Sequence, residues 1–453
     1  MFIYRLLAGA LLLALGTRVA AAQAELDLGS AMARARAGAG EVAAARSRAA
    51  AASARERGAR GIRWPELHLS ETWAHTDSPA EAFAFALNQE RFSFPAFAAS
   101  DPNAPAPIST AITRLEIRFP LWTGGEIDGR LAQAAAGARA ARSAADWTAD
   151  QAALAAGEAW VRLSEARAAV RLLERSRATV AAHLELARQY AAQGMLVRSD
   201  LLRAEVELAR MDDLLAEARG GERLAESALA FRLGDAEDRT YDLAPLADPP
   251  PAGGLDAWIA RAGERADLAA ARELLVAGEQ EVRARRAAYF PKVGVAARHD
   301  LVDDRLFGGH GESTSVYAGA TIALFDGGRR AAAVAEARAE LEAGRADVDR
   351  LARGVRLAVR DAWERATVAA SRRDTARHAL ESAAEAERIV GERFRSGVAR
   401  SLDVLDAATA RREAETRALT AAAEAQLAVL ELAVAAGRAP ESVLVSPIPG
   451  GQP

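Results

Sequence analysis

The chain has no cysteine, a single lysine and few aromatic residues. Without cysteine it can form neither a disulfide nor a thiolate zinc site. Its six histidines are scattered without metal-ligand spacing, and no glycine-rich loop of phosphate-binding form follows a strand. The sequence therefore predicts no metal site, no cofactor and no enzymatic activity.

An excess of charge of one sign is also missing, because basic and acidic residues interleave along the chain. Interleaved signs are typical of solvated helix faces, so we expect no nucleic acid partner. Beyond the N-terminus there is no run of about 18 apolar residues, the length that a transmembrane helix needs. The chain can then cross a membrane only as strands.

Residues 1–22 have the composition of a secretory signal peptide. Arg5 supplies a positive charge, Leu6 to Leu15 are mostly apolar, and Ala20-Ala21-Ala22 resembles a cleavage site. The apolar segment is short for a membrane span, which makes a signal anchor the weaker alternative. A mature chain that begins at Gln23 contains no cysteine that could carry a lipid, so we expect export without a lipid anchor.

What the sequence does contain is an internal duplication. The segment from Phe119 to Gly125 recurs as Ile322 to Gly328 after a shift of 203 residues, and the same shift carries Gly194 onto Gly397. A repeat of this length is a duplicated half-protein rather than a solenoid unit. We therefore divide the chain into a first repeat, a linker, a second repeat and a flexible C-terminal tail, at residues 23–235, 236–254, 255–437 and 438–453.

Each repeat begins with a helical segment, 25–62 or 255–288, and continues with a predicted β-hairpin at about 64–122 or 290–325. Apolar residues in the hairpins alternate with charged or small ones, which is the period of a strand; Glu71 is the one misfit. A long loop is expected at 75–110. Aromatic residues gather near the strand ends, as at membrane interfaces: Trp64, Trp73, Trp122, Tyr289, Phe290, Tyr317 and Phe325.

Strands of roughly 10 residues are long enough to cross a bilayer when tilted. Four strands cannot close a barrel, because about eight is the smallest number, so membrane strands here would require an oligomer. A soluble sheet packed on helices is the alternative.

Long helices follow the hairpins. Gly125 to Gln193 and Gly328 to Ser396 contain no proline, and each would form a rod of ~100 Å. Gly194 and Gly397 end these rods as C′ residues, and shorter helices follow to about Leu233 and about Ala436. Apolar positions recur every seven residues as in a coiled coil, although Arg177 interrupts the series. A free-standing coiled coil would explain the helices but not the strands.

The order and spacing of these features resemble the TolC-like outer-membrane efflux proteins, over essentially the whole mature chain. The resemblance rests on the hairpin entries at Pro65 and Pro291, on the two strand exits, and on the turns at Gly194 and Gly397. The strand exits read Pro120-Leu121-Trp122-Thr123-Gly124-Gly125 and Ala323-Leu324-Phe325-Asp326-Gly327-Gly328.

The resemblance implies an α+β membrane protein: a homotrimer with a 12-stranded β-barrel in the bacterial outer membrane, continued by a long α-helical coiled-coil barrel in the periplasm. It also implies a passive exit duct of a tripartite efflux or type I secretion system. Such a duct contacts outer-membrane lipid, a periplasmic adaptor protein and an inner-membrane pump of unknown class. The rival hypothesis is a structural periplasmic coiled-coil protein without a transport role; an adaptor would have one helical hairpin instead of two equal repeats.

The resemblance assigns roles to the turns as well. Adaptor docking is expected at Gly194, Met195 and Leu196 and at Gly397, Val398 and Ala399. Asp403 and Asp406 match aspartates that ring the periplasmic constriction of the family and share one helix face. They would favour cations, although the helix dipole alone also explains acids there.

Asp200, with Arg198 or Arg400, is expected to form a latch between helices. Two positions depart from family members with a closed tip. Ala399 and Phe394 stand where those members have arginine and tyrosine.

Overall fold

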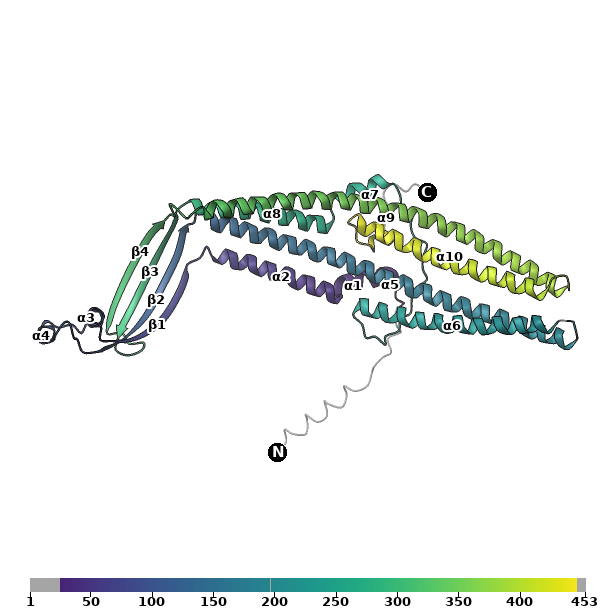
Figure 1. Ribbon diagram of the computed structural model, residues 1–453, viewed down its shortest axis with the longest axis horizontal. Helices are drawn as coiled ribbons and strands as arrows, with labels where there is room; N and C mark the ends of the chain where they lie inside the picture. Colours follow the sequence, from purple (N-terminus) through teal and green to yellow (C-terminus); the bar gives the residue numbers. More distant parts are fainter. Residues whose placement is uncertain (1–24, 196, 446–453) are drawn as a thin grey trace, which may run out of the picture. The chain divides into compact units, whose positions relative to one another are not determined.

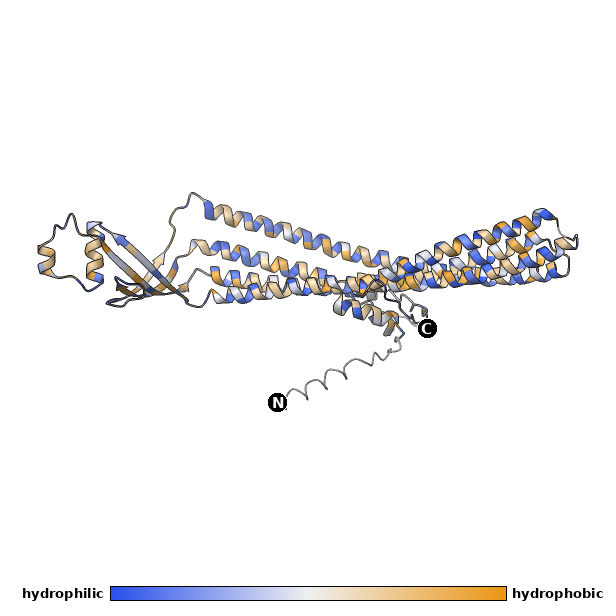
Figure 2. Cartoon of the chain, turned by 90° about the horizontal axis from the view of Figure 1, so that it is seen from below, coloured by the Kyte–Doolittle hydropathy of each residue, from blue (hydrophilic) through white to orange (hydrophobic). Residues whose placement is uncertain are grey.

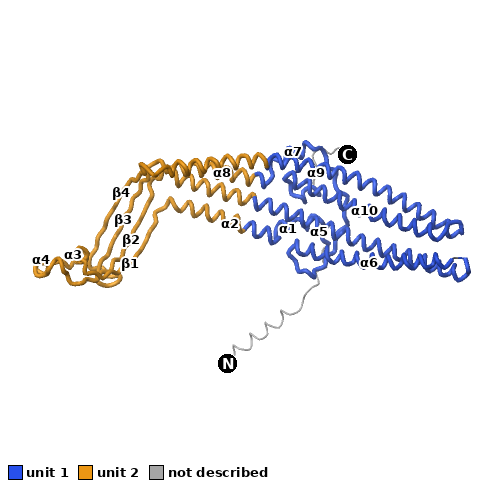
Figure 3. The backbone as a smooth tube through the Cα atoms, viewed as in Figure 1, with its two compact units in different colours: residues 1–46, 144–268, 351–453 blue, residues 47–143, 269–350 orange. Residues whose placement is uncertain are grey.

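The computed structural model describes residues 25–195 and 197–445 (Figure 1). The predicted signal peptide, Leu196 and residues 446–453 of the tail lie outside these ranges. The chain forms two compact units, coloured separately in Figure 3. Unit 1 takes its described residues from 25–46, 144–268 and 351–445, and unit 2 consists of 47–143 and 269–350. Each unit therefore contains parts of both predicted repeats.

Unit 2 contains a four-stranded antiparallel sheet in the order β1-β2-β3-β4. The first hairpin supplies β1 (Glu66–Thr76) and β2 (Ile108–Trp122), and the second supplies β3 (Lys292–Asp303) and β4 (Gly311–Thr321). β2 pairs with β3 along most of its length, which joins the two hairpins through their inner strands. β1 and β4 are the edges of this sheet.

The two faces of the sheet differ in polarity, as the alternation predicts. Leu67, Leu69 and Trp73 point to one face and are more than half exposed. Glu71 lies on that same face, where its carboxylate accepts hydrogen bonds from the Thr113 hydroxyl and from the backbone N–H of residue 307. The misfit of the pattern is thus a side chain that ties β1 to its neighbours.

The opposite face is charged. Arg114 of β2 donates through Nε and Nη2 to both carboxylate oxygens of Asp300 in β3, at 2.7 and 3.0 Å. Arg298 lies 3.7 Å from the same carboxylate and over the ring of Tyr317. Charged side chains are costly to bury in apolar surroundings. We therefore expect the face that carries these pairs to contact water rather than lipid.

β2 ends at Trp122, where the predicted first hairpin ends, and it passes Pro120 through an irregularity in its pairing, the kind of site at which a strand tolerates proline. Two other expectations are wrong. β4 ends at Thr321, so that Leu324 and Phe325 lie beyond it and are each 88% exposed. The loop at 75–110 contains two short helices, α3 (Pro79–Asn88) and α4 (Phe94–Ala98).

Four helices adjoin the strands in sequence: α2 (Gly40–Gly61), α5 (Glu126–Ala192), α8 (Ala266–Arg286) and α9 (Arg329–Arg395). A short 3₁₀ turn, η1 (Ala287–Tyr289), connects α8 to the strand that follows. α5 and α9 each contain 67 residues and match the predicted rods to within one residue. α5 packs closely on α8, because a Cβ placed on Gly129 would lie 3.0 Å from the Cβ of Ala284.

Unit 1 adds α1 (Leu28–Gly38), α6 (Arg198–Leu233), α7 (Leu255–Ala262), α10 (Ser401–Ala435) and α11 (Ser442–Val445). Its core joins the start of the described chain to its end. The indole of Trp160 in α5 is buried and donates to the carbonyl oxygen of Leu26 at 2.8 Å. Leu26 also bridges to Leu243 of the linker, which therefore belongs to the packed structure.

The helical segments at 25–62 and 255–288 are each broken once. The first divides at Ala39, an extended residue between two glycines, and the second divides between α7 and α8. Residues 438–445, expected to begin a flexible tail, pack on unit 1 instead. Val443 is only 2% exposed in the core, and Glu441 forms an ion pair with Arg36 at 2.5 Å.

Polar and apolar residues alternate around the long helices (Figure 2). By length and composition, α10 is apolar enough to span a membrane, which corrects the expectation that no segment would be. However, 61% of its most apolar window is buried within the protein. The buried residues include Leu430, Leu432 and Ala433 of the unit 1 core, so we interpret α10 as a packed core helix.

Candidate functional site

The turns between α5 and α6 and between α9 and α10 share one backbone geometry. Gly194 has φ +72° and Gly397 has φ +78°, a region that L-residues other than glycine rarely adopt. In each turn the residue after the glycine donates to a carbonyl five residues back, which is the Schellman motif. The two bonds, Met195 N–Tyr190 O and Val398 N–Arg393 O, both measure 2.9 Å. The prediction of C′ glycines is confirmed at both turns.

The turns present small apolar side chains to solvent. Met195, Val197 and Val398 are exposed, and Ala399 is half-buried. Leu196, the remaining predicted docking residue, lies outside the described residues. No atom of the described structure lies within 4 Å of a Cβ placed on Gly194 or Gly397, so space is open at both glycines.

The Asp403 side chain caps the start of α10 by accepting hydrogen bonds from Arg400. The Asp403 carboxylate accepts from the backbone N–H of Arg400 at 2.9 Å and from its guanidinium at 3.1 Å. These hydrogen bonds, the guanidinium first, hold the pKa of Asp403 below its ordinary value. Its negative charge is therefore offset within its own chain.

The other two predicted gate acids, Asp406 and Asp200, act on Arg400 only from a distance: after Asp403, their charges help to raise the pKa of its guanidinium. Asp406 is exposed one turn further along α10, and among the described residues it has no ion pair. Asp200 lies in the first turn of α6, two residues after the exposed Arg198. In the part of the chain that the structure describes, Asp200 forms no ion pair with Arg198 or Arg400. The latch therefore stays a prediction.

The structure instead joins the two turns through a contact that the sequence did not reveal. His183 Nε2 of α5 lies 2.8 Å from the Ser401 hydroxyl of α10, and both side chains are buried. Phe394 packs against the rings of His183 and Tyr190. Burial lowers the pKa of His183, which favours its neutral form. From the sequence, Phe394 is distinguished only as a departure from the tyrosine of family members with a closed tip.

Ion pairs between helices continue away from the turns. Arg412 of α10 lies 3.1 Å from Glu207 of α6, and both side chains are largely buried. Arg175 of α5 lies 2.5 Å from Glu415 of α10. Arg177, which interrupts the heptad pattern, pairs with Asp212 of α6. α10 is thus held to both α5 and α6 by charged contacts.

The predicted strand-to-helix transitions lie in unit 2. Pro65 and Pro291 each precede the first residue of a strand, where the missing N–H is tolerated. The glycine pairs that precede α5 and α9 have positive φ at all four positions: Gly124 +66°, Gly125 +89°, Gly327 +68° and Gly328 +85°. These bends need glycine for its backbone freedom, and they form no phosphate-binding loop.

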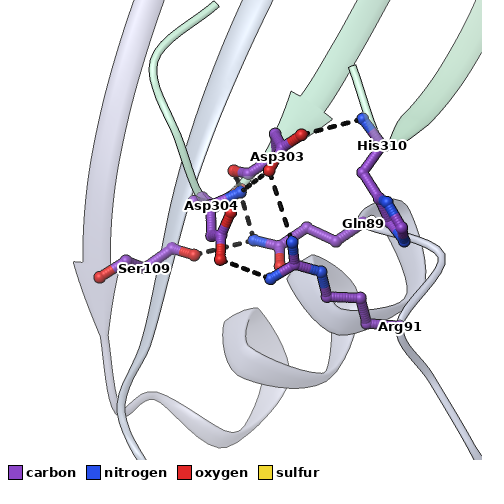
Figure 4. Close-up of polar contacts among 7 residues, drawn as sticks. Gln89, Arg91, Ser109, Asp303, Asp304 and His310 are labelled. Atoms are coloured by element: carbon purple, nitrogen blue, oxygen red, sulfur yellow. Dashed lines mark hydrogen bonds and ion pairs between the residues drawn. The ribbon is translucent and has the colours of Figure 1, made fainter. Parts of the chain in front are cut away.

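A second polar cluster fastens the hairpin loops to each other (Figure 4). Gln89, at the end of α3, is 1% exposed and donates to the carbonyl of Ser109 at 2.8 Å. Arg91 donates to the Asp304 carboxylate at 2.7 Å, and Asp303 accepts from the backbone N–H of His310 at 3.0 Å. This cluster was not predicted, because residues 75–110 were expected to form a loop without helices.

Among residues 25–195 and 197–445, no group of three His, Cys, Asp or Glu side chains is arranged to hold a metal ion. What stands out instead is the pair of helical hairpins, α5–α6 and α9–α10, whose turns have the same backbone geometry.

Comparison with known proteins assigns this arrangement. Residues 261–438 match the family described as Outer membrane efflux protein. These residues, which lie in the second half of the chain, are therefore similar to the outer membrane efflux proteins. The chain is also 27% identical over 259 residues to the outer membrane efflux protein BepC of Brucella suis. This match spans 55% of the chain and 55% of the length of BepC.

Solved structures agree on the fold over most of the chain. The outer membrane protein VceC of Vibrio cholerae superposes with a TM-score of 0.74 at 19% identity, covering 91% of this chain and 96% of VceC. The MtrE outer membrane channel of Neisseria gonorrhoeae, in its open state, gives 0.74 at 19% identity and covers 91% and 89%. The expected long helices and four strands per chain are therefore confirmed. The description of the family that residues 261–438 match is that of a transport protein.

Proposed function

We propose that the protein is the outer-membrane channel of a tripartite efflux or type I secretion system. It would act as a passive conduit for a solute that an inner-membrane pump drives, with a periplasmic adaptor between the two. The family match and the fold support this function. The observation that carries it is the sheet, which has one apolar face and two unpaired edges.

The sheet is unsuited to an isolated chain. Unpaired backbone groups at β1 and β4 would cost several kcal/mol each in a bilayer. Pairing the β4 edge of one copy with the β1 edge of the next removes both costs, and three copies give 12 strands, enough to close a barrel. The exposed leucines of β1 would then face lipid, and Arg114 and Asp300 would face the water-filled lumen.

Two neighbouring residues of β1 test this orientation. Leu69→Arg places a charge on the apolar face, where it costs about 2–4 kcal/mol at mid-membrane depth. Ser70→Arg places the same charge on the polar face and serves as the control. We expect Leu69→Arg to reduce the yield of a detergent-stable trimer, measured by native mass determination, and Ser70→Arg to leave it unchanged.

A monomeric or soluble periplasmic wild-type protein would contradict the proposed channel. That outcome would favour the alternative, a structural coiled-coil protein. Equal loss of trimer in the two variants would contradict the assignment of faces.

The open space at the turns supports adaptor docking there. Substituting valine for both Gly194 and Gly397 should leave the trimer intact but abolish crosslinking to the adaptor, because a β-branched residue disfavours positive φ. Gly221→Val in the interior of α6 is the matched control, since its φ is not positive. Undiminished crosslinking of the double variant would refute docking at the turns.

A further inference from the structure

Unit 2 contains a cavity of about 610 Å³ between the start of α5, the end of α8 and the start of α9. Cavities of roughly 300–1,000 Å³ are the size that binds small molecules. Three alanines, at positions 284, 288 and 333, supply apolar lining. The basic lining residues come from all three helices and from β3: Arg130, Arg285, Lys292, Arg329 and Arg330.

The cavity is positively charged overall, because only three acids line it. Glu126 is shared by two cations, with Arg130 and Lys292 both 2.5 Å from its carboxylate. Burial alone would raise the pKa of Glu126, but these two cations outweigh burial and hold its pKa below the ordinary value. One positive charge is therefore left over at this end of the cavity.

The other end has a second uncompensated cation. Glu281 pairs with Arg285 at 2.5 Å, and Asp326 pairs with Arg330 at 3.0 Å. Arg329 donates through Nε to the carbonyl oxygen of Asp326 at 3.0 Å, and within the described residues it has no acidic partner. Its two terminal nitrogens remain available, and a guanidinium fork matches the geometry of a carboxylate or phosphate.

Lys292 shows which face of the sheet the cavity adjoins. It is the first residue of β3 and lies six residues before Arg298, so by the alternation of a strand both side chains share one face. Arg298 and Asp300 belong to the charged network of that face. The cavity lining therefore includes a residue of the polar face of the sheet.

We propose that this cavity is a binding site for a soluble organic anion, a compound with an apolar body and a phosphate, sulfonate or carboxylate group. The anionic group binds Arg329 and Lys292, and the apolar body contacts the alanines. The placement of the cavity inside the conduit rests on the proposed function, because the polar face would form its wall. The binding itself does not, so each can fail separately.

Phenyl phosphate tests the site directly. Titrated into the purified full-length protein in detergent and followed by calorimetry, it should bind, whereas benzyl alcohol should not. The double variant Arg329→Gln, Lys292→Gln should weaken binding by at least about tenfold, equivalent to ~1.4 kcal/mol. The matched control is Arg338→Gln, an exposed residue of α9 outside the cavity lining, which should bind as the wild type does.

The single variant Arg329→Gln should also weaken binding, and it guards against misfolding because within the described residues this side chain forms no ion pair. No binding of phenyl phosphate to the wild type would overturn the proposal, as would equal affinity in wild type and double variant. Repeating the titration in phosphatidylglycerol and phosphatidylcholine nanodiscs distinguishes a lipid occupant. Weaker phenyl phosphate binding in phosphatidylglycerol alone would show that a lipid headgroup occupies the cavity and would overturn the soluble ligand.

Discussion

The ion pair between Glu207 and Arg412 gives the most specific test of how α10 is held. The two side chains are only 16% and 9% exposed, and Arg412 Nη1 lies 3.1 Å from Glu207 Oε1. Replacing Glu207 by Gln removes the negative charge and leaves the guanidinium buried without a counter-ion. Glu413 and Arg417 form the matched exposed pair on the same helix, at 3.8 Å with side chains 57% and 64% exposed.

The magnitudes separate the two substitutions clearly. Removing one partner of a buried ion pair costs about 3–5 kcal/mol, whereas an exposed pair contributes about 0–1 kcal/mol. We take ~3 kcal/mol for Glu207→Gln, because the amide can still accept one hydrogen bond. At ~1.4 kcal/mol per factor of ten, this corresponds to roughly a hundredfold increase in local opening of α10. Glu413→Gln should increase opening by no more than about fivefold.

Amide hydrogen exchange over α10, measured by mass spectrometry on the intact protein, reports this opening without requiring transport. The double variant Glu207→Gln, Arg412→Gln removes both charges and should recover part of the lost protection, because neutral replacement of a buried pair is often tolerated. Exchange in Glu207→Gln no faster than in Glu413→Gln would refute the reasoning. A double variant less protected than the sum of both single changes would refute it as well.

Gly124 and Gly327 have nearly the same φ, but only Gly124 lacks room for a Cβ, which would lie 2.7 Å from the Cβ of Phe290. Gly124→Ala should therefore lower the free energy of unfolding by ~1–3 kcal/mol more than Gly327→Ala, because the added Cβ overpacks the site. The thermal midpoint of Gly124→Ala should accordingly be the lower of the two, and equal midpoints would contradict the crowding. Asp406→Asn should reduce cation selectivity in planar bilayers more than Asp403→Asn, because Arg400 already offsets the charge of Asp403. Equal effects of the two substitutions would mean that Arg400 does not screen Asp403. Because the folded pKa of Asp403 lies below 3.8, its stabilising contribution is complete above that pH and is lost as pH falls through the lowered value. Protection of the first turn of α10 should therefore persist to about pH 4 and fall only below it.

The long helices were predictable because glycine marks where they end. Gly194 and Gly397 adopt the left-handed conformation common at helix C-termini, and both lie two residues beyond the last helical position. Proline misled the interpretation of the first loop. Prolines between residues 75 and 110 favoured a loop there, but Pro79 and Pro95 each lie in the first turn of a helix, where the fixed φ of proline is favourable.

The contacts of the candidate site could not be predicted in the same way. Glu207 and Arg412 are 205 residues apart, and their pairing depends on how α6 packs against α10. Whether Arg400 pairs with Asp403 or with Asp200 was equally open, because a local helix cap competes with a partner on another helix. Spacing in sequence identifies which residues share a face, but only the packed helices decide which charges meet.

The core of unit 1 has a consequence for the order of events during export. It includes Leu26, the second described residue, and Val443, close to the last. A chain that emerges from its N-terminus cannot complete this core until nearly all of it has been delivered. Contacts between such distant residues also slow folding. The surface that Val443 covers therefore stays exposed until the final residues arrive, and removal of residues 438–445 would leave the core open there.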